Sequence, residues 1–214
     1  MYKAVFFDFD GTLANDLNLF VKAYDFAFSK YGLRLKDEEI ARKCFNKTEE
    51  EIASTFNLPS GEEFRKYYFE GIEKNFINIP LFIGVIDILK YLQKNKIKLG
   101  VITFAKRWYI DSRLKETGIA DFFQSVISFN DVTNPKPHPE AVLTSCKNLG
   151  VNPEDSLLIG DARNDILMGK SAGCKTALFL PNENKEYYDL AVLKETNPDY
   201  IFSSFLDTKN IFYD

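Results

Sequence analysis

Histidine is almost absent from this sequence. His138 is the only one among 214 residues. Zinc clusters, Ser-His-Asp triads and phosphohistidine chemistry mostly need histidines, so the sequence disfavours all three. If the chain is an enzyme, carboxylates, lysines and hydroxyl groups must carry its chemistry. His138 itself is expected to be a loop residue without a catalytic role.

Cysteines and long apolar runs are also scarce. The three cysteines, Cys44, Cys146 and Cys174, lie far apart and show neither metal-ligand spacing nor an obvious disulfide set. No apolar run approaches the ~18 residues of a membrane span. Lys3 and Asp8 stand where a signal peptide needs an apolar stretch. We therefore expect a protein of the reducing cytoplasm with no membrane partner.

The charge balance argues against a further class of partner. The net charge is −4 and the pI is near 5.2, which disfavours a general nucleic-acid-binding surface. Hydrophobic residues make up 45% of the chain, enough to build a core and to exclude global disorder. The length suits one domain with an insertion, or two small domains.

From Leu81 onward, short β-branched runs alternate with helical patterns. Together with Lys3–Phe7, this alternation predicts a Rossmann-like α/β core, a parallel sheet with helices on both faces. Gly118, Gly150 and Gly173 stand where helices should stop. The predicted strands are Leu99–Thr103, Ser125–Ser128, Leu157–Gly160, Thr176–Leu180 and Tyr200–Phe202, and the predicted helices are Val85–Asn95, Trp108–Thr117, Pro139–Leu149 and Asn164–Ala172.

The chain between the first strand and this alternating region has a different pattern. It contains no convincing strand, and Thr48 with Glu51 has the spacing of a capping box that opens a helix. We expect an all-helical insertion over residues 15–81. The α/β core would then consist of residues 1–14 and 82–214.

Four of the predicted strands are followed by polar residues that could serve one site. In an open parallel sheet, ligands bind at the carboxyl ends of the strands, so these residues should meet there. They are Asp8 and Asp10 after the first strand, Thr103 after the second, Lys136 after the third, and Asp161 and Asp165 after the fourth.

The aspartates at these strand ends would repel one another. Asp8 and Asp10 are two residues apart and can face the same site. If Asp161 joins them, each pair of charges about 4 Å apart repels by roughly 4 kcal/mol at an effective dielectric near 20. A bound cation relieves this repulsion. Hard oxygen ligands in a site that also holds phosphate favour Mg²⁺ over Zn²⁺.

These residues carry a resemblance to a known family. The stretch "DFDGT", the strand-terminal Thr103, Lys136 and the stretch "GDARND" resemble the four motifs of the haloacid dehalogenase-like superfamily, in order and approximate spacing. The resemblance covers essentially the whole chain, and the helical insertion is similar to the first cap type of that family. Phosphoglycolate-phosphatase-like and β-phosphoglucomutase-like members look most similar. The resemblance implies a magnesium-dependent phosphatase that acts on a small phosphorylated metabolite.

The resemblance also implies roles for the aspartates. Asp8 would be the nucleophile that forms an aspartyl-phosphate. Asp10 would protonate the leaving alcohol and later deprotonate the hydrolytic water. The Asp8 side chain, the Asp10 backbone carbonyl and Asp161 would bind Mg²⁺. Asp165 would support the metal through water or outer contacts, unless it only caps the next helix.

Other residues would bind the phosphate and the rest of the substrate. Thr103, Lys136 and the backbone N–H of Phe104 would bind phosphoryl oxygens. Phe104 stands where the family often has Asn or another small polar residue, so that edge of the pocket should be more apolar. In the insertion, Asn46 and Lys47 of the stretch "CFNKT" could meet a polar or anionic substrate, or simply form an exposed loop.

Further features bear on the reaction type. Asp10 disfavours dehalogenase and phosphonatase chemistry, because relatives with those activities lack this aspartate. Phe20 stands where β-phosphoglucomutases typically carry a histidine, so hydrolysis is preferred over phosphoglucomutase-type transfer. Close relatives often carry Asp-Ser where Asn15 and Asp16 stand.

A catalytically idle phosphate-binding module of the same fold remains an alternative to an enzyme. The chain is expected to be a monomer or homodimer.

Overall fold

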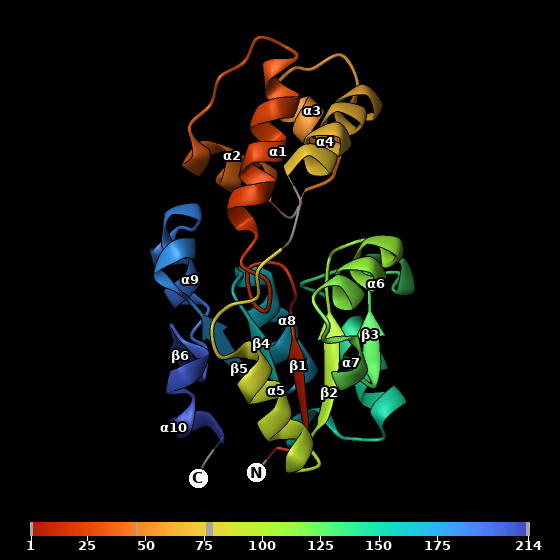
Figure 1. Cartoon of the computed structure of the whole chain (residues 1–214), viewed down its shortest axis with the longest axis vertical. Helices are drawn as coiled ribbons and strands as arrows, with labels where there is room; N and C mark the ends of the chain where they lie inside the picture. Colours follow the sequence, from red (N-terminus) through yellow and green to blue (C-terminus); the bar gives the residue numbers. More distant parts are fainter. Residues whose placement is uncertain (1, 46, 76–78, 213–214) are drawn as a thin grey trace.

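The computed structural model, which describes residues 2–45, 47–75 and 79–212, is organised around a six-stranded sheet (Figure 1). The strands are β1 (Ala4–Phe7), β2 (Lys98–Ile102), β3 (Ser125–Ile127), β4 (Ser156–Gly160), β5 (Lys175–Phe179) and β6 (Tyr200–Phe202). Their order is β3-β2-β1-β4-β5-β6, and every neighbouring pair is parallel. The predicted parallel core is therefore confirmed, with each strand end within one residue of its predicted position.

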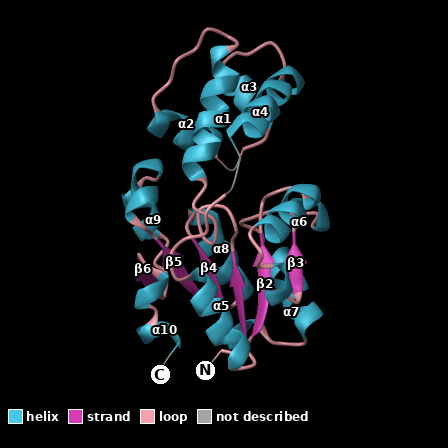
Figure 2. Ribbon diagram, viewed as in Figure 1, coloured by secondary structure: helices cyan, strands magenta, loops and turns pink. Residues whose placement is uncertain are grey.

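Helices cover both faces of the sheet (Figure 2). Successive residues of β1 enter different cores: Phe7 packs in the same core as Leu89, whereas Phe6 shares a second core with Val142 and Met168. This alternation follows from the two-residue period of a strand. The helices of this region are α5 (Val85–Lys94), α6 (Arg107–Glu116), α7 (Glu140–Leu149), α8 (Arg163–Ala172), α9 (Leu190–Glu195) and α10 (Lys209–Phe212).

The helices from α5 to α8 match the four predicted ones, whereas α9 and α10 were not predicted. Gly150 and Gly173 end α7 and α8 with φ values of 62° and 86°, as their positions predicted. The sequence pattern also missed several short 3₁₀ helices: η1 (Ala120–Phe122), η2 (Phe129–Asp131), η3 (Pro153–Asp155), η4 (Asn182–Tyr187) and η5 (Phe205–Asp207).

Four helices lie between β1 and α5, beyond the carboxyl ends of the strands (Figure 1). They are α1 (Leu17–Ser29), α2 (Asp37–Cys44), α3 (Glu49–Thr55) and α4 (Gly61–Asn75). The predicted capping box is present at the start of α3, where Thr48 and Glu51 bond reciprocally. Helices α1 and α4 pack closely, because Gly71 leaves room for the backbone of Ala23. Described residues 17–75 contain no strand.

The chain enters and leaves this helical insertion through two adjacent segments. The N–H of Asn15 donates to the carbonyl of Pro80 over 2.8 Å, and the N–H of Phe82 donates to the carbonyl of Leu13 over 3.0 Å. The two connections therefore lie side by side at the positions where the sequence predicts the crossings. The division into two domains at these positions stays a prediction.

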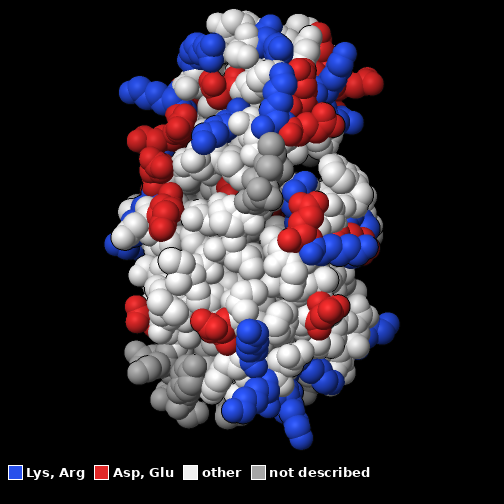
Figure 3. Space-filling view, in the orientation of Figure 1, with Lys and Arg blue, Asp and Glu red and all other residues white. Residues whose placement is uncertain are grey.

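One face of the molecule, shown in Figure 3, carries mixed charge. In Figure 3, acidic and basic side chains are interspersed over the insertion, and the centre of this face of the sheet region carries few charges. None of the described helices combines the length and the apolar character needed to cross a membrane.

Candidate active site

The polar residues predicted at the strand ends lie together at the carboxyl edge of the sheet. Asp8 follows β1 directly, and its N–H donates to the carbonyl of Ile159 in β4 over 2.9 Å. Thr103 follows β2 in the same way, with its N–H 2.9 Å from the carbonyl oxygen of Ile127. These bonds extend the parallel ladder beyond the strand ends, so the backbone holds both residues in place.

Lys136 is the centre of a charged cluster. Its Nζ lies 2.9 Å from Asp8 Oδ1 and 2.7 Å from Asp165 Oδ1, and the residue is only 8% exposed. Burial by itself lowers the pKa of Lys136, but the charges of Asp165 and Asp8 outweigh burial, so the pKa is raised. The lysine is therefore a permanent cation that connects the end of β1 to α8.

Three carboxylates form a compact group beside this lysine. One oxygen each from Asp8, Asp161 and Asp165 lies within 4.8 Å of the other two. Burial, followed by the charge of Asp165, raises the pKa of Asp161 to about 7. Burial also raises the pKa of Asp8 well above its ordinary value, against the opposing charge of Lys136. A further cation would let all three acids stay ionised, and their hard oxygens fit Mg²⁺.

Both oxygens of Asp161 accept hydrogen bonds from side chains. Thr12 Oγ1 donates to Oδ1 over 2.9 Å, and the Tyr188 hydroxyl donates to Oδ2. Gly11 has a φ of 75°, and a Cβ there would lie 2.2 Å from Asp161 Oδ2, so the close approach requires glycine. Sequence reasoning missed Tyr188, because it lies in irregular chain after β5 and no motif marks it.

Asp165 contributes to the fold as well as to the charged cluster. While Oδ1 accepts from Lys136, Oδ2 accepts from the backbone N–H of Ala162 over 3.1 Å. This second bond satisfies a free donor at the start of α8, as expected of a helix-capping acid. The two interpretations of Asp165 are therefore compatible.

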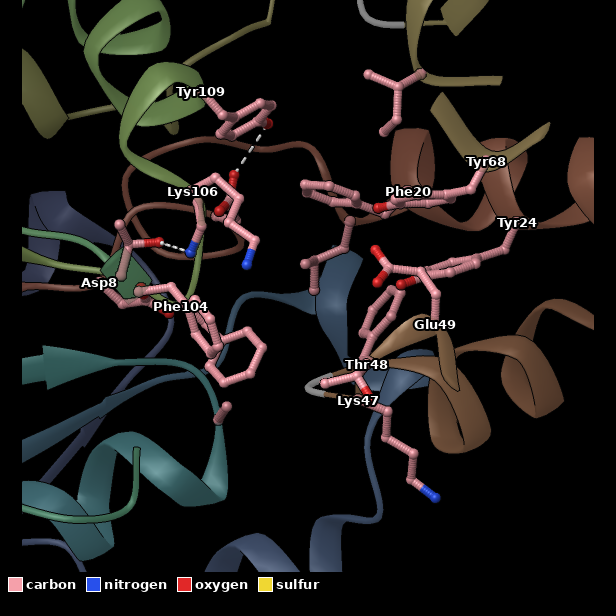
Figure 4. A pocket seen from close by; sticks show the side chains of 18 of the residues that line it. Asp8, Phe20, Tyr24, Lys47, Thr48, Glu49, Tyr68, Phe104, Lys106 and Tyr109 are labelled. Carbon is pink, nitrogen blue, oxygen red and sulfur yellow. Dashed lines mark hydrogen bonds between the residues drawn. The ribbon is translucent and has the colours of Figure 1, made fainter. Parts of the chain in front are cut away.

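Asp10 has a different set of partners. Its Oδ1 accepts a hydrogen bond from the Tyr109 hydroxyl over 3.2 Å (Figure 4), and its carboxyl group interacts with that of Asp16. Burial raises the pKa of Asp10. Burial, followed by the charge of Asp10, raises the pKa of Asp16 well above its ordinary value. Among the described residues, the group of three carboxylates does not include the Asp10 side chain. Its metal contact through the backbone carbonyl stays a prediction.

Thr103 and Phe104 form the edge of the site next to Asp8. The Thr103 hydroxyl oxygen accepts from the N–H of Ala105 over 3.0 Å, which fixes the turn after β2. The Phe104 ring packs edge-on against Phe129, with ring centroids 5.0 Å apart. This edge is apolar, as the departure from the family pattern predicted. The phosphate-binding role of both residues stays a prediction.

A cavity of about 220 Å³ opens over these groups. Asp8, Asp10, Thr103 and Asp161 line it from the core, and residues of α1, α4 and the loop between α2 and α3 line it from the insertion. Figure 4 shows the two sets facing each other. A substrate phosphate at Asp8 would therefore place its leaving group against the insertion.

The loop between α2 and α3 is the predicted specificity segment. Lys47 lines the cavity, but its side chain extends away from Asp8 in Figure 4. Glu49, which was not predicted, turns its carboxylate toward the cavity in the same view. Asn46 lies outside the described residues, so its predicted contact stays a prediction.

Comparison with known proteins identifies the family. The family model described as "Haloacid dehalogenase-like hydrolase" matches residues 5–179. The chain belongs to the haloacid dehalogenase-like hydrolases. Pyrophosphatase PpaX of Oceanobacillus iheyensis is 32% identical over 96% of this chain and 94% of its own length. Phosphoglycolate phosphatase of Salmonella typhi is 31% identical over 96% of this chain and 90% of its own length.

Solved structures of such hydrolases share the fold. A haloacid dehalogenase family hydrolase from Deinococcus radiodurans, solved with bound phosphate and sodium, superposes with a TM-score of 0.82. The match covers 97% of this chain and 93% of the other at 19% identity. The family model and the phosphatase names of the two relatives confirm the predicted class of this haloacid dehalogenase-like hydrolase, a phosphatase.

Proposed function

We propose that the chain is a magnesium-dependent phosphatase that hydrolyses a small phosphate monoester through an aspartyl-phosphate on Asp8. The observation that carries this proposal is the meeting of Asp8, Asp161, Asp165 and Lys136 at one sheet edge, where Asp8 and Asp161 line the cavity. A carboxylate nucleophile needs a neighbouring cation to approach a phosphate dianion. Lys136 supplies one such cation, and the three carboxylates offer a site for a metal ion as the second.

Asp8, Asp161 and the Asp10 backbone carbonyl would hold Mg²⁺, and Asp165 would support it. When bound, the ion neutralises charge on Asp8 and on the phosphoryl oxygens. Lys136 supplies a second positive charge from the chain itself, because its Nζ already contacts Asp8. Thr103 and the N–H of Phe104 would orient the remaining phosphoryl oxygens.

The reaction would occur in two transfers. A carboxylate oxygen of Asp8 forms a bond to phosphorus, while the bond from phosphorus to the leaving oxygen breaks. Asp10 gives its proton to that oxygen, and the Tyr109 hydroxyl positions the Asp10 carboxyl for this step. Asp10 then takes a proton from water, which attacks phosphorus and releases Asp8 and inorganic phosphate.

Hydrolysis is favoured over transfer to a second position of the substrate. Phe20, which stands where β-phosphoglucomutases carry a histidine, lines the cavity and offers no proton-transfer group. The only histidine of the chain, His138, has a side chain that is 52% exposed and accepts from the N–H of Glu140. It is not among the described residues that line the cavity.

The proposal is tested by turnover of p-nitrophenyl phosphate with Mg²⁺ and with EDTA. The wild-type protein should release nitrophenol only with Mg²⁺, and Asp8→Asn should release none. Equal turnover with EDTA, or activity in Asp8→Asn, would refute the mechanism. No turnover of any phosphate ester by a folded wild-type protein would instead favour the idle binding module.

The proposal extends to the substrate, the cellular compartment and the oligomeric state of the protein. We expect a small phosphorylated metabolite as the substrate and the cytoplasm as the compartment, since the three buried cysteines are unpaired. A monomer or a homodimer is expected, and sedimentation equilibrium measures which of the two forms.

A further inference from the structure

Aromatic side chains dominate the cavity beyond the phosphate end. Ten of the 22 described residues that line it are Phe, Tyr or Trp. Several of these rings are only partly covered by the protein, and Trp108 is 58% exposed. Leaving apolar surface in water costs free energy, so half-buried rings beside a reaction centre, such as Phe20 and Phe104, indicate a ligand that covers them. Tyr24 and Tyr68, by contrast, are themselves buried.

The rings form two walls. On the insertion, Tyr24 and Tyr68 stack with centroids 4.3 Å apart and planes 21° apart. On the core, Phe104 packs edge-on against Phe129 at 5.0 Å. Figure 4 shows Phe104 on one side of the cavity and the two tyrosines on the other. The leaving group of a phosphate held at Asp8 would lie between these walls.

The charges at this end of the cavity do not form a second anion site. Lys47 extends away from the phosphate end, whereas the Glu49 carboxylate turns toward the cavity (Figure 4). Among the described residues, Glu49 has one cationic partner, Arg65, at 3.5 Å. The other lysine of the described lining, Lys106, has its Nζ 3.9 Å from the centroid of Phe129, in cation–π contact. A second phosphate or a carboxylate here would face Glu49.

The size of the cavity limits the ligand further. Its volume of about 220 Å³ is below the ~300–1,000 Å³ of sites for drug-sized ligands. A dry cavity of ~150 Å³ is enough for benzene. The space therefore suits one small ring.

We propose that the substrate carries its phosphate on a small planar aromatic group without a second anionic group, held between Phe104 and the Tyr24–Tyr68 pair. This inference rests on the proposed phosphatase function and adds the substrate class. A flat ring contacts the Phe104 ring over a larger area than a saturated group of equal size does, and such an aromatic pair adds affinity.

The first experiment compares four substrates with wild-type protein and Mg²⁺. Benzyl phosphate carries the planar ring, and cyclohexylmethyl phosphate has nearly the same size and a similarly basic leaving group, but no flat face. Pyrophosphate and 2-phosphoglycolate carry a second anionic group instead. We expect kcat/KM for benzyl phosphate to exceed that for cyclohexylmethyl phosphate by up to about tenfold, the upper end of one aromatic contact, and to exceed those for pyrophosphate and 2-phosphoglycolate.

The second experiment changes one wall. Phe104→Leu keeps an apolar side chain but removes the ring, so the ratio of kcat/KM between benzyl and cyclohexylmethyl phosphate should fall severalfold toward one. The ratio cancels any general loss of activity. Phe26→Leu is the matched control, since Phe26 lies on α1 but is not among the described lining residues; it should keep the wild-type ratio.

The outcomes separate this inference from the proposed function. If pyrophosphate or 2-phosphoglycolate is hydrolysed more efficiently than benzyl phosphate, the substrate class is wrong and the phosphatase stands. A ratio of kcat/KM between benzyl and cyclohexylmethyl phosphate near one in the wild type also refutes the aromatic site. An unchanged ratio in Phe104→Leu does the same, and the rings would then serve only in packing. Failure of all four substrates and of p-nitrophenyl phosphate would refute the phosphatase itself.

Discussion

Replacing Lys136 with methionine tests the electrostatic balance of the site. Methionine keeps most of the volume and removes the charge that contacts Asp8 at 2.9 Å and Asp165 at 2.7 Å. Without metal, the change leaves Asp8, Asp161 and Asp165 close together with no lysine beside them. We expect the free energy of unfolding to fall, because buried carboxylates lose their only close cation among the described residues.

The size of the loss follows from these distances. At an effective dielectric of about 20, each ion pair near 2.8 Å has a Coulomb energy of about 6 kcal/mol, and desolvation of the charges offsets much of it. Removing one partner of a buried ion pair typically costs about 3–5 kcal/mol. We therefore expect Lys136→Met to lose about 3–5 kcal/mol in EDTA.

Lys175→Met provides the matched control. Lys175 also forms an ion pair at 2.7 Å, with Asp199, but its side chain is 57% exposed. An exposed pair contributes less than about 1 kcal/mol, so this variant should unfold close to the wild type. Both variants remove a lysine that lies 2.7 Å from a carboxylate, and they differ in burial and in the second partner of Lys136, Asp8.

Urea unfolding followed by far-ultraviolet circular dichroism measures both variants, in mildly alkaline buffer with EDTA and with Mg²⁺. Because Lys136 repels a cation bound nearby, Mg²⁺ should stabilise Lys136→Met more than it stabilises the wild type. Equal losses for the two lysine variants in EDTA would refute the argument. So would a smaller effect of Mg²⁺ on Lys136→Met than on the wild type.

Three further predictions concern the chemistry. Asp10→Asn should lower turnover of an alkyl phosphate by about 10²–10⁴-fold and that of p-nitrophenyl phosphate much less, because nitrophenol leaves without a proton; steady-state kinetics measure both, and equal losses contradict the acid role. Tyr188→Phe removes the hydrogen bond to Asp161 and should weaken Mg²⁺ binding about tenfold. Calorimetric titration should find wild-type Mg²⁺ affinity in the control Tyr187→Phe. Wild-type affinity in Tyr188→Phe would show that the Tyr188 hydroxyl does not contribute to Mg²⁺ binding. Ca²⁺ should inhibit turnover, since its looser and more numerous ligands misplace Asp8; full activity with Ca²⁺ would contradict this.

The regular elements of the core could be read from the sequence because each depends on local pattern. The apolar runs of β1 and β4 are short and continuous, as expected of strands buried on both faces. Gly150 and Gly173 take positive φ values at helix ends, a conformation that glycine adopts without cost. By contrast, α9 is only six residues long and follows a 3₁₀ helix, so no clear period marks it.

The hydrogen-bond partners of the active-site aspartates could not be predicted from the sequence. Tyr109 reaches Asp10 across 99 positions, and Tyr188 reaches Asp161 across 27, so neither contact leaves a local pattern. The tyrosines Tyr24 and Tyr68 belong to no motif in the sequence. They stack, and they also line the cavity, since the insertion lies over the sheet edge.

The identity of the chemical groups that meet at the sheet edge follows from the sequence alone. Parallel strands all end at one edge, so residues that follow strands, such as Asp8, Thr103 and Asp161, converge whatever the loops do. The groups that face them across the cavity depend on tertiary packing. The position of the insertion depends on packing between distant segments, such as Phe45 against Tyr187 with ring centroids 6.3 Å apart, and such contacts have no signature in local sequence.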